Sequence, residues 1–131
     1  TAFINSEYIQ SQENGITGNE VEFIPKINLK TGFNIQYQSI STSLQFTFLS
    51  KQYTDATNAI ESNLSGVIGE IPYYQVLDLI FSYKGNKYKL ESGINNLLNK
   101  SYFTRRATGY PGPGIIPSPQ RNYYLTLELR F

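Results

Sequence analysis

The chain has 131 residues, of which 40% are hydrophobic and 16% charged, and its 11 Lys and Arg residues against 10 Asp and Glu residues give a net charge of +1. So balanced a charge excludes the strongly basic surface that binds nucleic acid, and the composition is typical of an ordered β protein. Neither Cys nor His is present, which excludes disulfides, thiolate metal sites and the commonest general base, so we expect no enzyme activity.

Alternation of apolar and polar side chains, the period of a strand with two different faces, recurs six times along the chain. It predicts strands near residues 2–9, 24–37, 42–53, 73–83, 87–97 and 121–131. In the last of these, Tyr123, Leu125, Leu127, Leu129 and Phe131 alternate with polar residues. We therefore expect an all-β fold of antiparallel strands in up-and-down order, with one apolar and one polar face.

The predicted connections alternate between long and short. Long loops cover residues 10–23, 54–72 and 98–120, whereas residues 38–41 and 84–86 form short turns. All the short turns should therefore share one end of the sheet. The second turn is predicted to be a two-residue hairpin that pairs Lys84 with Lys87 and Tyr83 with Tyr88, because Gly85 and Asn86 accept the positive φ angles of primed turns.

The strand lengths favour a transmembrane barrel. No run approaches the roughly 18 apolar residues of a transmembrane helix, so this chain could span a bilayer only as strands. About 10 residues at about 3.3 Å each, tilted by about 40°, span roughly the 25 Å apolar band of an outer membrane. Because the smallest membrane barrels have about eight strands, the chain is predicted to be one arc of a larger barrel, and its edges must pair with further strands.

Outer-membrane barrels place short turns in the periplasm and long loops outside the cell. Two aromatic girdles are then expected, with Tyr37, Tyr83, Tyr88 and Phe131 near the periplasmic interface and Phe23, Tyr53, Tyr73 and Tyr123 near the outer one. Charged residues on the polar face near the periplasmic end should line a wet lumen. These are Lys87, Lys89, Glu91, Glu128 and Arg130.

Three segments add a family resemblance. Residues 93–103, followed by a loop rich in Pro and Gly and the strand 121–131, resemble the end of TonB-dependent outer-membrane receptors. Residues 24–29 and 53–58 are similar to the same family, and residues 110–119 before 121–124 look most like ferric-dicitrate-type siderophore receptors. The resemblance covers nearly the whole chain, as the C-terminal part of the barrel.

The resemblance implies a barrel of about 22 strands in the bacterial outer membrane, with its C-terminus in the periplasm. It implies import of a ferric siderophore or ferric citrate, with heme, cobalamin or a glycan as substitutes. The implied partners are lipid, the N-terminal barrel strands and plug domain of the same protein, the TonB complex, and the barrel-assembly machinery, which would read Phe131. The plug and its coupling peptide would precede residue 1. No cofactor is implied beyond a ferric chelate as ligand.

Guanidinium groups recognise the carboxylates of anionic ferric chelates through paired hydrogen bonds. Arg105, Arg106 and Arg121 flank the last long loop, and with Tyr110 they are the candidate ligand contacts. Gln52 and Asn58 are weaker candidates. The alternative is that these residues are solvated loop positions without a ligand.

Two other functions also fit these strands. A passive porin wall would have the same strands without an upstream plug. A soluble β-sheet binding module would have its strands half buried in a sandwich and would fold alone in water.

Overall fold

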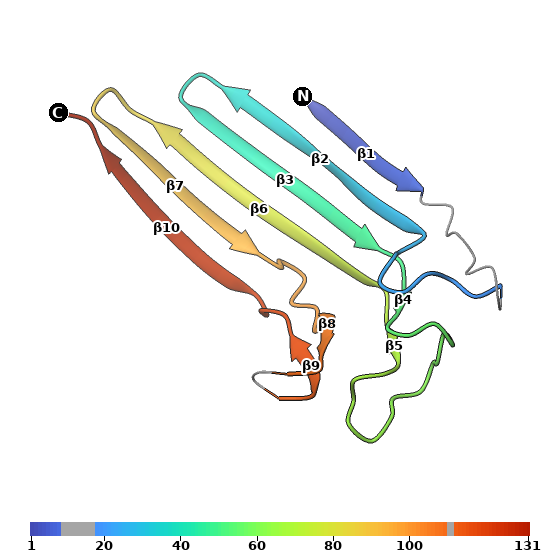
Figure 1. The fold of residues 1–131 in the computed structure, drawn as a ribbon. Helices are drawn as coiled ribbons and strands as arrows, with labels where there is room; N and C mark the ends of the chain where they lie inside the picture. The colour runs from blue at the N-terminus through green and yellow to red at the C-terminus, as the bar shows by residue number, and fades with distance from the viewer. Residues whose placement is uncertain (9–17, 110–111) are drawn as a thin grey trace.

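The computed structural model describes residues 1–8, 18–109 and 112–131, apart from the side chains of residues 7 and 8. Six antiparallel strands form one sheet in the order β1-β2-β3-β6-β7-β10 (Figure 1). Their bounds are β1 (Ala2–Tyr8), β2 (Ile27–Tyr37), β3 (Ile40–Leu49), β6 (Tyr74–Lys84), β7 (Tyr88–Asn95) and β10 (Asn122–Leu129). The expected all-β, up-and-down antiparallel sheet is confirmed. No helix in the described part is long and apolar enough to cross a membrane.

Strand pairing places the alternating side chains on common faces. Phe33 of β2 pairs with Leu44 of β3, which pairs with Leu79 of β6, so three apolar side chains share one face across three strands. The polar face carries their neighbours, and Gln45 of β3 lies opposite Asp78 of β6. One-sided polarity, the basis of the barrel prediction, therefore holds at these positions of β2, β3 and β6, although Val76 and Ile80 interrupt the polar face of β6.

The apolar face is open rather than packed. Phe33 is 58% exposed and Ile35 is 67% exposed, although both lie within a strand of the sheet. The few buried apolar side chains include Tyr53 and Ile71, which lie beyond the sheet. Among the described residues, Val76 of β6 is the one buried apolar side chain within the strands of the sheet. A large exposed apolar face marks an interaction with lipid or another protein surface.

The long and short connections lie at opposite ends of the sheet, as predicted. The β2–β3 and β6–β7 turns lie at the same end as both termini (Figure 1), and the described parts of the three long connections lie at the other. Several predicted strand limits differ from the observed ones, and two of them differ by three residues or more. Residues 24–26 precede β2, and the strand expected over 42–53 ends at Leu49.

Two short ribbons lie within the long connections and were not predicted. The first pairs β4 (Gln52–Tyr53) with β5 (Glu70–Ile71), and the second pairs β8 (Phe103–Ala107) with β9 (Gly114–Pro117). Tyr53 was assigned to the outer aromatic girdle, which is wrong because its side chain is buried in the first ribbon. Both ribbons lie beyond the same end of the sheet (Figure 1).

The predicted hairpin register between β6 and β7 is wrong by two residues. Lys84 pairs with Lys89 and Tyr83 with Leu90, and the Gly85 N–H donates to the Tyr88 carbonyl oxygen over 2.8 Å, so the turn is Asn86–Lys87. Neither Gly85 nor Asn86 has a positive φ. The Tyr88 ring lies against Gly85 instead, 2.8 Å from where a Cβ would stand. A two-residue shift keeps every side chain on its face, so alternation alone cannot detect it.

Candidate functional site

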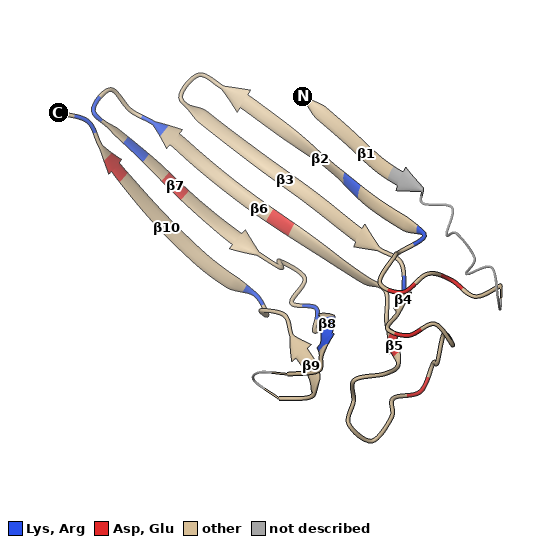
Figure 2. Cartoon of the chain, in the orientation of Figure 1, with Lys and Arg blue, Asp and Glu red and all other residues tan. Residues whose placement is uncertain are grey.

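The long connections gather into one body of loops, which we call the loop cluster: residues 18–26, 50–73 and 96–121 outside the strands of the sheet, without the undescribed 110–111. Its two ribbons touch, because β5 packs against β8. Figure 2 shows positive charge on β8, from its two arginines, whereas Asp and Glu lie along the connections around β4 and β5. Positive and negative sides of the loop cluster therefore meet at this contact.

Arg106 connects the two sides. Its side chain is only 9% exposed. Its Nη1 donates to the Gly66 carbonyl oxygen over 2.8 Å, and its Nη2 and Nε donate to the Glu70 carbonyl oxygen over 2.9 and 3.3 Å. The guanidinium also lies over the Phe103 ring, 5.2 Å from its centroid. Charged hydrogen bonds of this kind are among the stronger ones in proteins, so Arg106 holds the β8–β9 ribbon to residues 66–70.

The other predicted ligand contacts lie in different surroundings. Arg105 is exposed on β8, next to Arg106 and opposite Ile116 of β9. Arg121 is exposed just before β10, and its backbone N–H donates to the Asn99 side-chain oxygen over 3.1 Å. Tyr110 lies outside the described residues. Arg105 and Arg121 thus present their guanidinium groups to solvent, and Arg106 does not.

The two weaker candidates have internal partners. The Asn58 side chain accepts the Glu20 N–H over 2.7 Å and donates to the Glu20 carbonyl oxygen over 2.9 Å. It therefore joins residues 18–26 to the connection after β4. Gln52 is 8% exposed and pairs with Ile71 in the first ribbon. The Asn58 side chain therefore organises the loop cluster, and the Gln52 side chain is buried within it.

A turn beside Asn58 shows how the connection is shaped. The Asp55 carboxylate accepts hydrogen bonds from the Thr57 hydroxyl, from the Thr57 N–H over 3.0 Å and from the Ala59 N–H over 3.2 Å. The Thr57 hydroxyl bond, followed by these N–H groups, lowers the pKa of Asp55. This Asx turn places Asn58 in the left-handed region, at φ 55°.

Sequence reasoning missed an aromatic hollow at the base of the loop cluster. Tyr74 at the start of β6 stacks on Tyr102, with ring centroids 4.8 Å apart. Together with Lys100 they border a cavity of about 180 Å³. The Tyr73–Tyr74 doublet was the available signal. Stacked rings beside an ammonium group could hold a planar or anionic group.

The described residues contain no group of three or more carboxylate, His or Cys side chains placed to hold a metal ion. On the polar face, Lys89 Nζ lies 3.0 Å from Glu91 Oε2, and beyond β10 Arg130 Nε lies 3.0 Å from Glu128 Oε1. These pairs match the mixed charges expected of a lumen wall.

No protein-family model matches the sequence, and no curated protein matches it. Among solved structures, the chain is similar to the ferric citrate transporter FecA in its unliganded form, with 25% identity, a TM-score of 0.78, and coverage of 87% of this chain and 18% of that one. The siderophore receptor PiuA from Acinetobacter baumannii gives 20% identity and a TM-score of 0.66, with 84% and 14% covered. The ferric enterobactin receptor PfeA from Pseudomonas aeruginosa gives 22% identity and a TM-score of 0.69, with coverage of 96% of this chain and 19% of that one.

Each of these structures is a transporter or a receptor, and each is several times longer than this chain, which spans less than a fifth of it. The strand arrangement found here is therefore that of one barrel segment of such proteins. The resemblance to TonB-dependent receptors is confirmed by these neighbours, and a ferric citrate transporter is one of them.

Proposed function

From a fold shared with the barrel wall of TonB-dependent receptors, we propose that this chain is part of a bacterial outer-membrane transporter that imports a ferric chelate, with ferric citrate as the first candidate. The observation that carries the proposal is the six-stranded sheet with an apolar and a polar face, matched at a TM-score of 0.78 by a ferric citrate transporter. The apolar face would contact lipid and the polar face the lumen.

The proposal sets the orientation and the partners. The short-turn end and Phe131 face the periplasm, and the loop cluster faces the outside. Further barrel strands of the same protein pair with the free edges of β1 and β10, since neither edge has a partner among the described residues. A plug domain in the lumen and the TonB complex supply gating and energy. Arg105, Arg121 and Tyr110 contact the anionic chelate, while Arg106 positions the ribbon that carries Arg105.

The test uses the full-length parent protein in cells that lack other ferric citrate uptake. We expect iron-limited growth and uptake of radiolabelled iron with ferric citrate, and loss of uptake when the proton-motive force is collapsed. Arg105→Gln should weaken surface binding about tenfold, the loss expected for a charge-assisted hydrogen bond. The matched control is Arg130→Gln, the same change at the residue that directly follows the end of β10. Uptake that persists without the proton-motive force would point to a passive porin and contradict the proposal.

Phe131 is proposed as the signal for the barrel-assembly machinery. Its side chain is fully exposed, two residues beyond the end of β10. Phe131→Asp should reduce the amount of folded, heat-modifiable receptor in the outer membrane several-fold, because a charge replaces the terminal aromatic. Phe131→Tyr should insert normally. Equal insertion of the Asp variant and the unchanged protein would refute this role.

A further inference from the structure

The polar face is hollowed at its short-turn end. A cavity of about 290 Å³ lies between the β2–β3 turn and the ends of β6 and β7. We call it the short-turn hollow, and its polar lining includes Gln36, Ser41, Ser82, Lys84, Lys89 and Glu91. Its lining residues lie at the short-turn end of the sheet, whereas the loop cluster lies at the other end (Figure 1).

Two lysines lie side by side in the lining of this hollow, which contains a single carboxylate, that of Glu91. Lys84 of β6 pairs directly with Lys89 of β7, and like charges in that position repel. Glu91 forms an ion pair with Lys89. Lys84 takes part in none of the ion pairs found among the described residues.

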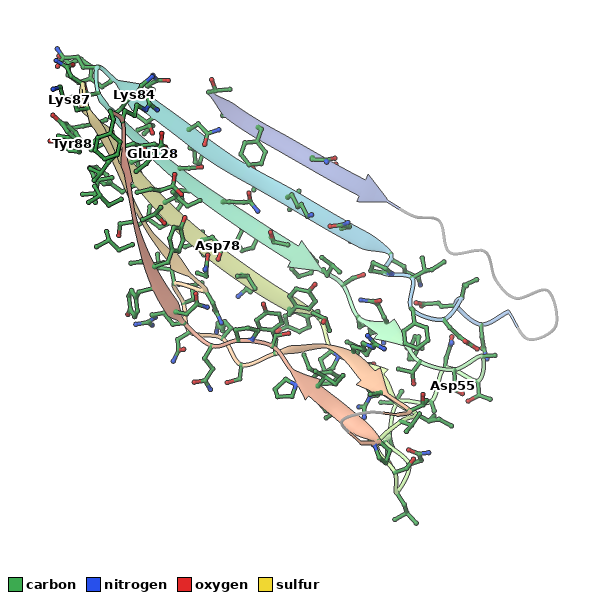
Figure 3. The ribbon with its side chains drawn as sticks, turned by 60° about the vertical axis from the view of Figure 1, so that its left-hand side comes forward. Asp55, Asp78, Lys84, Lys87, Tyr88 and Glu128 are labelled. Atoms are coloured by element: carbon green, nitrogen blue, oxygen red, sulfur yellow. The ribbon has the colours of Figure 1, made fainter. Side chains whose placement is uncertain are left out.

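The nearby acidic groups are engaged elsewhere. Glu128 lies opposite Lys89 in the ladder, but its carboxylate meets Arg130 Nε at 3.0 Å. Asp78, the one acidic residue of β6, lies further down the strand, where it accepts the Asn96 N–H over 2.8 Å. Figure 3 shows Lys84 and Lys87 together at the short-turn end, with Asp78 midway along the sheet and Asp55 at the far end.

We infer that the short-turn hollow is a second anion-binding site, which takes the carboxylate groups of the chelate as they leave the lumen. Two ammonium groups supply charge, and the Gln36 amide and the Ser41 and Ser82 hydroxyls supply further donors. A bound carboxylate would remove the repulsion between Lys84 and Lys89. The inference rests on the proposed function, because the chelate is the anion that must pass this end of the wall.

The first experiment is direct and does not need transport. Purified full-length receptor in detergent is treated with acetic anhydride, with and without citrate, and lysine acetylation is measured by mass spectrometry. We expect millimolar citrate to slow acetylation of Lys84 and Lys89 at least threefold and to leave Lys30 unchanged. Lys30 is the matched control, because it lies on the same face, in β2 away from the hollow. Equal protection of all three lysines, or of none, would overturn the inference.

The second experiment measures import. The double variant Lys84→Gln and Lys89→Gln should import ferric citrate about tenfold more slowly, as expected for lost charge-assisted hydrogen bonds, with surface binding and thermal stability unchanged. Lys84→Arg should retain import, and Lys30→Gln should behave as the unchanged protein. A double variant that instead melts at a lower temperature would show that acidic groups of the protein itself fill the hollow, which overturns the inference. If citrate protects the two lysines but the unchanged receptor does not import ferric citrate, the proposed cargo fails and the site stands.

Discussion

Replacing Gly32 by alanine should destabilise the folded sheet by about 3 kcal/mol, the upper range for overpacking a tight site. Gly32 is buried in β2, and a Cβ there would stand closer than 3.0 Å to the Leu44 carbonyl oxygen and 2.8 Å from the Phe3 ring. The ring can rotate away. The carbonyl belongs to the neighbouring strand β3, so β2 and β3 must separate locally. Urea unfolding of the full-length protein in lipid vesicles measures the free energy.

Two other glycines provide graded controls for that measurement. Gly109→Ala should be neutral, because an added Cβ there meets nothing within 4 Å and the residue has no positive φ. Gly93→Ala should cost about 1 kcal/mol, because the group in the way is the movable Tyr124 ring, which would also leave its 3.4 Å contact with Glu91. Equal free energies for the Gly32 and Gly109 variants would contradict the steric argument.

Alternation in the sequence was sufficient to predict the sheet. A strand with one apolar and one polar face has side chains that alternate with a period of two residues, which can be read from the sequence. The six main strands, their faces and the shared end of the short turns were therefore predicted from the local pattern. The register of the β6–β7 hairpin did not follow, because a shift of two residues leaves that pattern intact. In the observed register the Tyr88 ring lies against Gly85, a contact that alternation does not encode.

The candidate site was less predictable, for a physical reason. Arg106 and Asn58 were selected as ligand contacts from their chemistry, yet the structure engages their side chains with backbone groups of Gly66, Glu70 and Glu20. Every residue has a backbone carbonyl and nearly every one has an N–H. The sequence therefore cannot show which backbone groups a given side chain will bind. The β8–β9 ribbon was missed similarly, since its strands are too short for alternation to be read.

Arg106→Met is expected to detach the β8–β9 ribbon from the connection before β6 while the sheet stays intact. The variant keeps the length of the side chain but loses all three hydrogen bonds to the Gly66 and Glu70 carbonyl oxygens. A loss of about 2 kcal/mol of local stability corresponds to roughly 30-fold faster exchange of the amides that this contact protects. Hydrogen–deuterium exchange at residues 67–70 of the full-length protein measures it, without any ligand.

The neighbouring arginine makes the control for this experiment. Arg105→Met is the same change one position along the strand, on an exposed side chain, and should leave exchange at residues 67–70 unchanged. Arg106→Lys should not restore protection, because an ammonium group cannot reproduce the fork that reaches both carbonyl oxygens. If Arg106 acted on the ligand instead of on the loops, Arg106→Met would weaken ferric citrate binding and leave exchange in the free receptor as it was. We expect the Arg106 variant to show both faster exchange and weaker binding, and the Arg105 variant to show weaker binding alone. That result would identify Arg106 as the residue that positions the ribbon and Arg105 as the residue that contacts the chelate.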